Sequence, residues 1–358
     1  MLTWVRPWIA ALGCVAAVSA GAAMVPPALE RPALAVRAPE RAVLLAVAAA
    51  GPRLVAVGER GIVALSDDQG QRWRQARSVP TSVSLTALRF VDALRGWAVG
   101  HAGVILHTTD GGETWTRQAD GRSLAQAALN AAARTPGDAQ VRLAQQLVDD
   151  GADKPLLDLH FYDANRGVVA GAYGMFFETT DGGKTWNSAM DRIVNPKALH
   201  INAMRADGNA LYLAGEQGLL LRSDDQGKTF RPLTSPYAGT WFTLAVPRPG
   251  TVLAAGLRGN AFISGDQGDN WSRLESAAQA SYVSAAELPG DEVILANQAG
   301  QLLRSRADDA LKVLPLPPLP PVSAILPLAE GALLAVGFTG ALRLPGPAVS
   351  PVAQGAVK

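Results

Sequence analysis

Five acidic turns are the part of this sequence whose residue types and spacing most resemble a chemical site. Each follows the Asp-box pattern Ser/Thr-x-Asp-x-Gly-x-Thr-Trp/Phe, and the aspartates of the five copies are Asp68, Asp110, Asp181, Asp225 and Asp266. The pattern resembles an EF-hand calcium loop, but no copy has a glutamate at the later position that supplies the bidentate ligand. We therefore predict that the carboxylates accept backbone N–H groups within their own turns, and that they bind no metal.

Catalytic side chains are harder to find. The histidines His101, His107 and His160 lie in turn or strand patterns, and no Ser/His/Asp arrangement can be ordered from the sequence. Asp-boxes also occur in sialidases, which use a Phe/Tyr-Arg-Ile-Pro motif, but the nearest string here, Leu342-Arg-Leu-Pro345, stands at the wrong end of the chain. We predict a protein without enzymatic activity and without a cofactor. The alternative is a sialidase-like glycoside hydrolase or a carbohydrate-binding Asp-box propeller.

The elements that position these turns follow a repeat. A Gly-x-x-Gly turn precedes each Asp-box, and the second glycine of this turn recurs at positions 61, 103, 174, 218, 259, 300 and 340. The spacing is 40–44 residues in every case but one, where it is 71. Short strands with apolar residues at alternate positions fill each period. A period of about 40–50 residues with four strands per unit predicts an all-β fold, a seven-bladed β-propeller with Asp-box turns.

The long interval interrupts this all-β pattern. Residues 121–155 are rich in helix formers and predict a helical-hairpin insertion between the second and third blades. An insertion of this size on a regular scaffold favours a functional role. Residues 33–345 form the predicted propeller, in which Ala33–Val36 is expected to supply the fourth strand of the last blade. The C-terminal tail, residues 346–358, is the alternative source of that strand.

The N-terminal residues 1–23 predict a secretory signal peptide. Arg6 precedes an apolar run, and Ala20-Gly-Ala22 offers a cleavage site. An uncleaved N-terminal anchor is the alternative, because the apolar run is close to the length of a membrane span. We expect an exported monomer in the periplasm or on the periplasmic face of the inner membrane, peripheral to that membrane at most. The net charge of +1 argues against a general nucleic-acid-binding protein.

One face of the predicted propeller is the expected binding surface. The Gly-x-x-Gly turns and the connections between blades share this face, and the Asp-boxes lie on the opposite one. Exposed aromatic and arginine side chains are favoured anchors of protein interfaces. The residues predicted to bind a partner here are Arg60, His101, Tyr173, Glu216, Tyr237, Trp241, Phe242 and Arg258. The alternative is that they are ordinary turn residues and strand ends.

Two stretches, Gly96–Trp115 and Arg166–Trp186, make the chain similar to the photosystem II stability/assembly factor family, the Ycf48-like Asp-box propellers. The similarity spans essentially the whole mature chain at the period of that family. It implies a seven-bladed propeller that binds a membrane-protein subunit during assembly, without catalysis. The helical insertion departs from the photosynthetic members. Relatives in bacteria without photosystems look like exported accessory proteins of a membrane transporter, which makes a transporter component a second expected partner.

Overall fold

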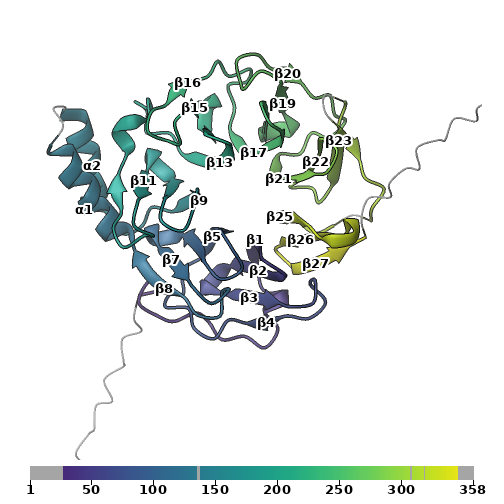
Figure 1. Cartoon of the computed structure of the whole chain (residues 1–358), viewed down its shortest axis with the longest axis horizontal. Helices are drawn as coiled ribbons and strands as arrows, with labels where there is room; N and C mark the ends of the chain where they lie inside the picture. Colours follow the sequence, from purple (N-terminus) through teal and green to yellow (C-terminus); the bar gives the residue numbers. More distant parts are fainter. Residues whose placement is uncertain (1–26, 135–137, 307–308, 318, 346–358) are drawn as a thin grey trace, which may run out of the picture.

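The computed structural model describes residues 27–134, 138–306, 309–317 and 319–345, which form seven antiparallel sheets arranged in a ring (Figure 1). The prediction of a seven-bladed β-propeller is confirmed. The predicted signal peptide and the C-terminal tail fall within residues 1–26 and 346–358, which lie outside the described residues.

Strands within each blade are paired in sequence order, and the first strand of each blade lines the central channel. The first three blades consist of β1 (Leu44–Ala50), β2 (Arg53–Gly58), β3 (Val63–Ser66) and β4 (Arg74–Gln75); β5 (Leu85–Phe90), β6 (Gly96–Gly100), β7 (Ile105–Thr108) and β8 (Thr116–Ala119); and β9 (Leu156–Phe161), β10 (Gly167–Gly171), β11 (Phe176–Thr179) and β12 (Asn187–Ser188).

The remaining blades continue the same arrangement around the ring. They consist of β13 (Ile201–Asp207), β14 (Ala210–Gly215), β15 (Leu220–Ser223) and β16 (Arg231–Pro232); β17 (Trp241–Arg248), β18 (Thr251–Gly256), β19 (Ala261–Ser264) and β20 (Ser272–Arg273); β21 (Tyr282–Leu288), β22 (Glu292–Asn297), β23 (Leu302–Arg306) and β24 (Lys312–Val313); and β25 (Val322–Pro327), β26 (Leu333–Gly337) and β27 (Gly340–Leu344).

The hydrophobic core lies between neighbouring blades. Every residue of β6 and of β10 is buried, because each second strand is covered on both faces by the adjacent sheets. The aromatic residue that closes an Asp-box packs against the preceding blade. Trp115 of blade 2 lies in one cluster with Val55 and Leu65 of blade 1, and Trp73 of blade 1 packs with Leu334 of blade 7. The repeat therefore buries its apolar surface only when neighbouring blades are present.

The Asp-box carboxylates are bonded within their own turns. Asp181 accepts the backbone N–H of Thr185 at 2.9 Å and the hydroxyl of the same residue at 2.7 Å. These bonds, the backbone one first, lower the pKa of Asp181 to about 2. Equivalent backbone bonds from the residue four positions later reach Asp68, Asp110, Asp225 and Asp266.

The long interval between blades 2 and 3 forms two helices, α1 (Gly121–Ala132) and α2 (Asp138–Asp150), which pack against each other outside the ring (Figure 1). Helix α1 begins at a capping box, in which the Asp120 carboxylate accepts the backbone N–H groups of Arg122 and Ser123. Helix α2 ends immediately before Gly151, whose φ of 76° suits a helix C-terminus.

One side of α1 completes the core between blades 2 and 3. Leu124 and Ala128 are buried in the cluster that contains Trp97 and Phe161. The rings of Trp97 and Phe161 are stacked, with centroids 3.6 Å apart and an interplanar angle of 12°. The insertion is thus a structural part of the propeller as well as a projection from its surface.

The last blade differs from the prediction. Its sheet has three strands among the described residues, and Ala33–Val36 is not one of them, so the prediction for this segment was wrong. Ala33 donates its backbone N–H to Val79 and Leu34 donates to Arg60, which places the segment against blade 1. The ring closes through the packing of β1 on β25 and β26. Apolar side chains of blades 1 and 7, such as Leu44 and Val336, share one cluster and supply that closure without strand exchange.

Candidate partner-binding groove

The Gly-x-x-Gly turns present their third residue in a left-handed backbone conformation. Arg60, Tyr173 and Arg258 have φ angles of 54°, 56° and 58°, and all three are exposed. A bulky residue rarely adopts such an angle, and the cost is of order 1–3 kcal/mol. A neighbouring backbone approaches the first glycine of the turn so closely that no side chain would fit there. A Cβ at Gly171 would lie 2.3 Å from the carbonyl oxygen of Pro155. The backbone at the start of β9 therefore requires glycine at this position, and the turn leaves Tyr173 exposed while Ala172 is buried.

Backbone hydrogen bonds define the two faces of the ring. Gly61 donates to Val83 at 2.9 Å and Gly218 donates to Gly239 at 2.8 Å, which joins the Gly-x-x-Gly turns to the connections between blades. On the other face, Gly182 of an Asp-box donates to Asn165 at 2.8 Å, in the turn between the first two strands of its blade. We call the first of these the connection face. It carries the turn residues predicted to bind a partner.

Tyr173 and Glu216, two of the residues predicted to bind a partner, both contact His200 at the seam between blades 3 and 4. The ring of Tyr173 lies 5.2 Å from the ring of His200, and the Lys154 ammonium lies 5.1 Å from the centre of the Tyr173 ring. Glu216 accepts the backbone N–H of His200 at 2.9 Å. Arg60, His101 and Arg258 lie in the turns of blades 1, 2 and 5 and are not part of this cluster.

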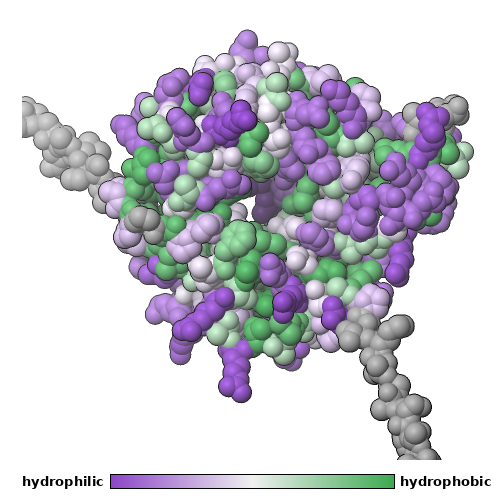
Figure 2. All heavy atoms as spheres, turned by 180° about the vertical axis from the view of Figure 1, so that it is seen from behind, coloured by the Kyte–Doolittle hydropathy of each residue, from purple (hydrophilic) through white to green (hydrophobic). Residues whose placement is uncertain are grey.

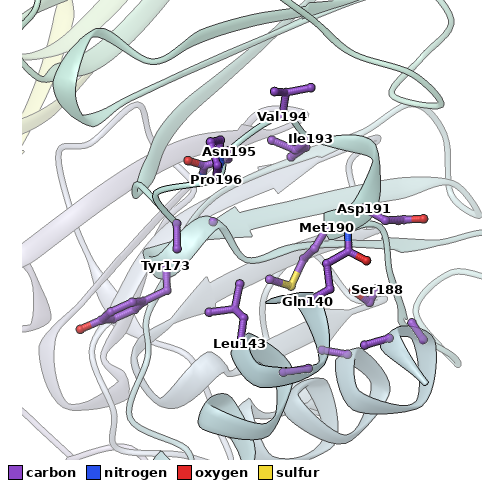
Figure 3. A pocket seen from close by; sticks show the side chains of 16 residues that line it. Gln140, Leu143, Tyr173, Ser188, Met190, Asp191, Ile193, Val194, Asn195 and Pro196 are labelled. Carbon is purple, nitrogen blue, oxygen red and sulfur yellow. The ribbon is translucent and has the colours of Figure 1, made fainter. Parts of the chain in front are cut away.

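A groove of about 410 Å³ lies next to Tyr173, between the helical insertion and the connection that leads from blade 3 to blade 4. Figure 3 shows Leu143 rising from the helical wall and Met190 reaching towards it from the opposite wall. Small and apolar residues line most of the surface: Ala128, Ala131, Ala132, Leu143, Ala144, Met190, Ile193, Val194, Pro196 and Ala198. The volume falls in the range of about 300–1,000 Å³ that is usual for ligand pockets.

The sequence reasoning missed the connection that forms the second wall. Residues 189–200 join β12 to β13, whereas the corresponding connections at 233–240 and 274–281 are shorter. Asn195 closes the extra length into a loop, because its side chain accepts the backbone N–H of Leu199 at 3.0 Å and donates to the carbonyl of the same residue at 2.9 Å. The loop leaves Val194 61% exposed. The length of this connection was the signal in the sequence that could have indicated the groove.

Trp241 and Phe242, two aromatic residues predicted to bind a partner, do not lie on the connection face. Trp241 is 0% exposed, so its assignment to a binding surface is corrected. Its indole N–H donates to Ser235 at 3.2 Å and its ring meets that of Tyr237 at 5.5 Å, which fixes it in the core between blades 4 and 5. Phe242, the next residue, lines the central channel. Alternation along a strand explains both positions, since successive side chains point to opposite sides.

The central channel carries a charged network and opens as a hollow near the middle of the ring in Figure 2. The buried Asp158 carboxylate lies 3.5 Å from the guanidinium groups of both Arg89 and Arg205 and accepts the backbone N–H of Met204 at 2.8 Å. His160 lies nearby, and burial, followed by the charge of Arg89, lowers its pKa to about 4. This network ties blades 2, 3 and 4 together at the channel wall.

Within the described ranges, no three His, Cys, Asp or Glu side chains are grouped so that they could hold a metal ion. No described helix is both long and apolar enough to span a bilayer.

Comparisons with known proteins found a matching family and a sequence relative. A family profile described as "Photosynthesis system II assembly factor YCF48" matches residues 35–144 and 137–272. The "Photosystem II assembly lipoprotein Ycf48" of Synechococcus sp. (strain CC9902) is 25% identical over 270 residues, which cover 69% of this chain and 80% of that protein.

Two solved structures share the fold. A structure described as "YCF48 bound to D1 peptide" superposes with a TM-score of 0.64 at 18% identity and covers 88% of this chain and 99% of that one. The structure of YCF48 from Cyanidioschyzon merolae gives a TM-score of 0.64 at 15% identity, with 86% and 97% of the two chains covered.

Proposed function

Because this chain belongs to the photosynthesis system II assembly factor YCF48 family, we propose that it is a non-enzymatic scaffold that binds a membrane-protein subunit during assembly. The match to the family over residues 35–272 is the observation that carries the proposal. The relative from Synechococcus is named an assembly protein, and one structural relative was solved with a peptide named D1. By analogy, the partner of this chain presents a peptide segment to the propeller.

The connection face is the surface proposed for this contact. It carries the exposed turn residues Arg60, His101, Tyr173 and Arg258, and it also holds the groove beside the insertion. The Asp-box face offers less for recognition, because the acidic side chains there are bonded within their own turns. Aromatic and arginine side chains around an apolar depression are typical of protein-binding surfaces.

We propose an exported location at the membrane surface. The apolar segment within residues 1–23 supports this, either as a cleaved signal peptide or as a retained anchor. The Synechococcus relative is named a lipoprotein, a class of protein attached to a membrane through lipid. A scaffold for membrane-protein assembly requires such a position.

The tyrosine chemistry speaks against the sialidase alternative. A tyrosine nucleophile needs an accessible phenol and a neighbouring general base that accepts its proton. Tyr212 and Tyr282 are buried, and burial raises the pKa of both phenols. Burial likewise raises the pKa of Tyr162, whose hydroxyl has no hydrogen-bond partner among the described residues. These phenols are therefore poorer nucleophiles than a free tyrosine.

A pull-down from detergent-solubilised host membranes tests the proposal. The full chain carrying an affinity tag is expected to recover one membrane-protein complex, identified by mass spectrometry as a photosystem subunit or a transporter component. An excess of untagged chain serves as the control and must displace the recovered complex. Failure to recover any displaceable membrane protein, or turnover of a fluorogenic sialoside by the purified chain, would overturn the proposed function.

A further inference from the structure

The groove beside the insertion has walls that are mostly apolar and almost uncharged. Asp191 is the one charged side chain among the described residues that line the groove. Figure 3 shows it at the opposite end of the groove from Tyr173. No lysine or arginine is among the described residues that line the groove, so a segment rich in carboxylates would find no counter-charge from them and would meet Asp191. The complementary occupant is uncharged and apolar.

The size of the groove limits that occupant further. A volume of about 410 Å³ admits a few side chains, not a whole domain. Alanines at positions 128, 131 and 132 form a smooth helical wall that lets a backbone approach closely, while Leu143 and Met190 supply larger apolar contacts. Tyr173 and Val194 stand at the rim, 40% and 61% exposed. A short peptide with two or three apolar side chains fits these walls.

The course of the N-terminal chain indicates from which side such a peptide arrives. The carbonyl oxygen of Ala28 accepts the backbone N–H of Ser82 at 2.8 Å, in the connection between blades 1 and 2. Glu30 pairs with Arg117 at 3.1 Å and lies 3.8 Å from Arg122, in the first turn of α1. The first described residues, Pro27 to Glu30, are therefore held on the connection face, beside the insertion.

Helix α1 spans the distance from this attachment to the groove. Its residues Arg122 and Ala131 lie at its two ends, and a helix of this length measures about 18 Å. While the apolar N-terminal segment is inserted in a membrane, during export or as an anchor, the groove lies close to the bilayer surface. A ligand of the groove is then presented from the membrane side.

We infer that the groove receives an uncharged, apolar stretch of the membrane-protein partner, located next to one of that partner's membrane spans. This rests on the proposed function and adds the position and the chemistry of the contact. Tyr173 and Val194 close over the bound stretch, and the alanine wall of α1 supports it from the other side. The contact is specified by shape and by the lack of basic side chains among the described lining residues, where Asp191 is the one charged group.

Photo-crosslinking of the full chain tests this inference. Benzoylphenylalanine is placed at position 194 on the groove rim, at 338 elsewhere on the connection face and at 94 on the Asp-box face. The native side chains, Val194, Phe338 and Leu94, are 61%, 60% and 58% exposed, so that the three positions are matched in accessibility. Each variant is irradiated with host membranes, and the crosslinked peptides are sequenced by mass spectrometry.

The expected result is a crosslink from position 194 alone, to an uncharged stretch adjacent to a membrane span of the protein recovered by the pull-down. Val194→Asp should then weaken binding of that protein about tenfold, while Phe338→Asp should change it by less than about twofold. Recovery of the partner together with a crosslink to a charged stretch, to lipid or to a second copy of the chain would overturn the inference and leave the proposed function standing. Recovery of no membrane protein by the unmodified chain would overturn both.

Discussion

The ring of Tyr173 lies 5.2 Å from the ring of His200, which places the Gly-x-x-Gly turn of blade 3 against the residue that leads into blade 4. Tyr173 holds a φ of 56° in this position and remains 40% exposed. This strained aromatic residue lies at the rim of the apolar groove proposed to bind the partner, which makes Tyr173 the most informative side chain to change.

Tyr173→Gly should separate binding from folding. Glycine adopts a positive φ freely, and relief of the backbone strain is expected to offset the lost ring contacts, so that the free energy of unfolding changes by less than about 1 kcal/mol. Affinity for the partner recovered in the pull-down should fall about tenfold. Arg258→Gly makes the same backbone change outside the groove, because Arg258 occupies the same turn position in blade 5 with a φ of 58°, and it should weaken binding less than Tyr173→Gly. An equal loss of binding in both variants would contradict the role of Tyr173.

Leu124→Ala should show that the insertion supports the fold. Leu124 is 1% exposed in the cluster that contains Trp97 and Phe161, so truncation leaves a cavity between blades 2 and 3. A loss of about 2–5 kcal/mol in the free energy of unfolding is expected in urea titrations. Gln126→Ala on the same helix, whose side chain is exposed, should cost less than about 0.5 kcal/mol. A small effect of Leu124→Ala would mean that the helices can be deleted without damage to the propeller.

Asp158→Ala should destabilise the channel wall. The substitution leaves Arg89 and Arg205 without their shared carboxylate and removes the acceptor of the Met204 backbone N–H. Because both arginines retain some contact with water, the expected loss is on the order of 2–4 kcal/mol in the free energy of unfolding. Asp158→Asn, which keeps one carbonyl acceptor, should lose less. Equal losses in both variants would assign the effect to the lost charge, which both substitutions remove, and not to packing or to the bond from Met204.

His160 should make the protein less stable as the pH falls from about 6.5 to about 4. Burial, then the charge of Arg89, lowers the pKa of the folded-state imidazole to about 4, although Asp158 acts in the opposite direction. In this window the unfolded chain binds a proton at His160 and the folded chain does not, so the free energy of unfolding decreases with falling pH. His160→Gln should flatten this slope. An NMR titration that gives a pKa near 6.5 for His160 in the folded protein would contradict the prediction.

Asp181→Asn should weaken blade 3 at neutral pH but not in acid. Hydrogen bonds from Thr185 hold the pKa of Asp181 at about 2, below its value in an unfolded chain. The ionised carboxylate therefore contributes stability above about pH 4, and this contribution is lost as the pH falls towards 2. The variant is expected to lose about 1 kcal/mol in the free energy of unfolding at pH 7. Urea titrations at both pH values measure the difference, which must shrink at pH 2 if the carboxylate is the cause.

The blade count and the strand positions were predictable because the signals that carry them are local. The Gly-x-x-Gly turn is required where two strands approach closely, and the predicted four strands per unit are present in six of the seven described sheets. The Asp-box chemistry is also short in range, since Asp181 bonds to residues two and four positions away. A pattern of this kind needs no knowledge of the rest of the chain.

Exposure of single residues was predictable only in part. Tyr173 and Arg258 stand in turns and are exposed, whereas Trp241 begins a strand and is completely buried. The boundary between turn and strand, together with the side of the strand on which a residue falls, decides this difference. An error of one position in a predicted strand therefore assigns a buried residue to the surface.

By itself, the sequence determined a ring of seven repeated sheets and the chemistry of the turns that shape them, because each signal lies within one repeat. The tertiary structure alone decided how the ring closes and where the groove lies. The two walls of the groove come from residues 128–132 with 140–144 and from residues 188–198, and they meet only because the helical insertion folds back onto the connection leading out of blade 3. No local pattern encodes such a contact, since it depends on the packing of two segments that neighbouring blades hold in place.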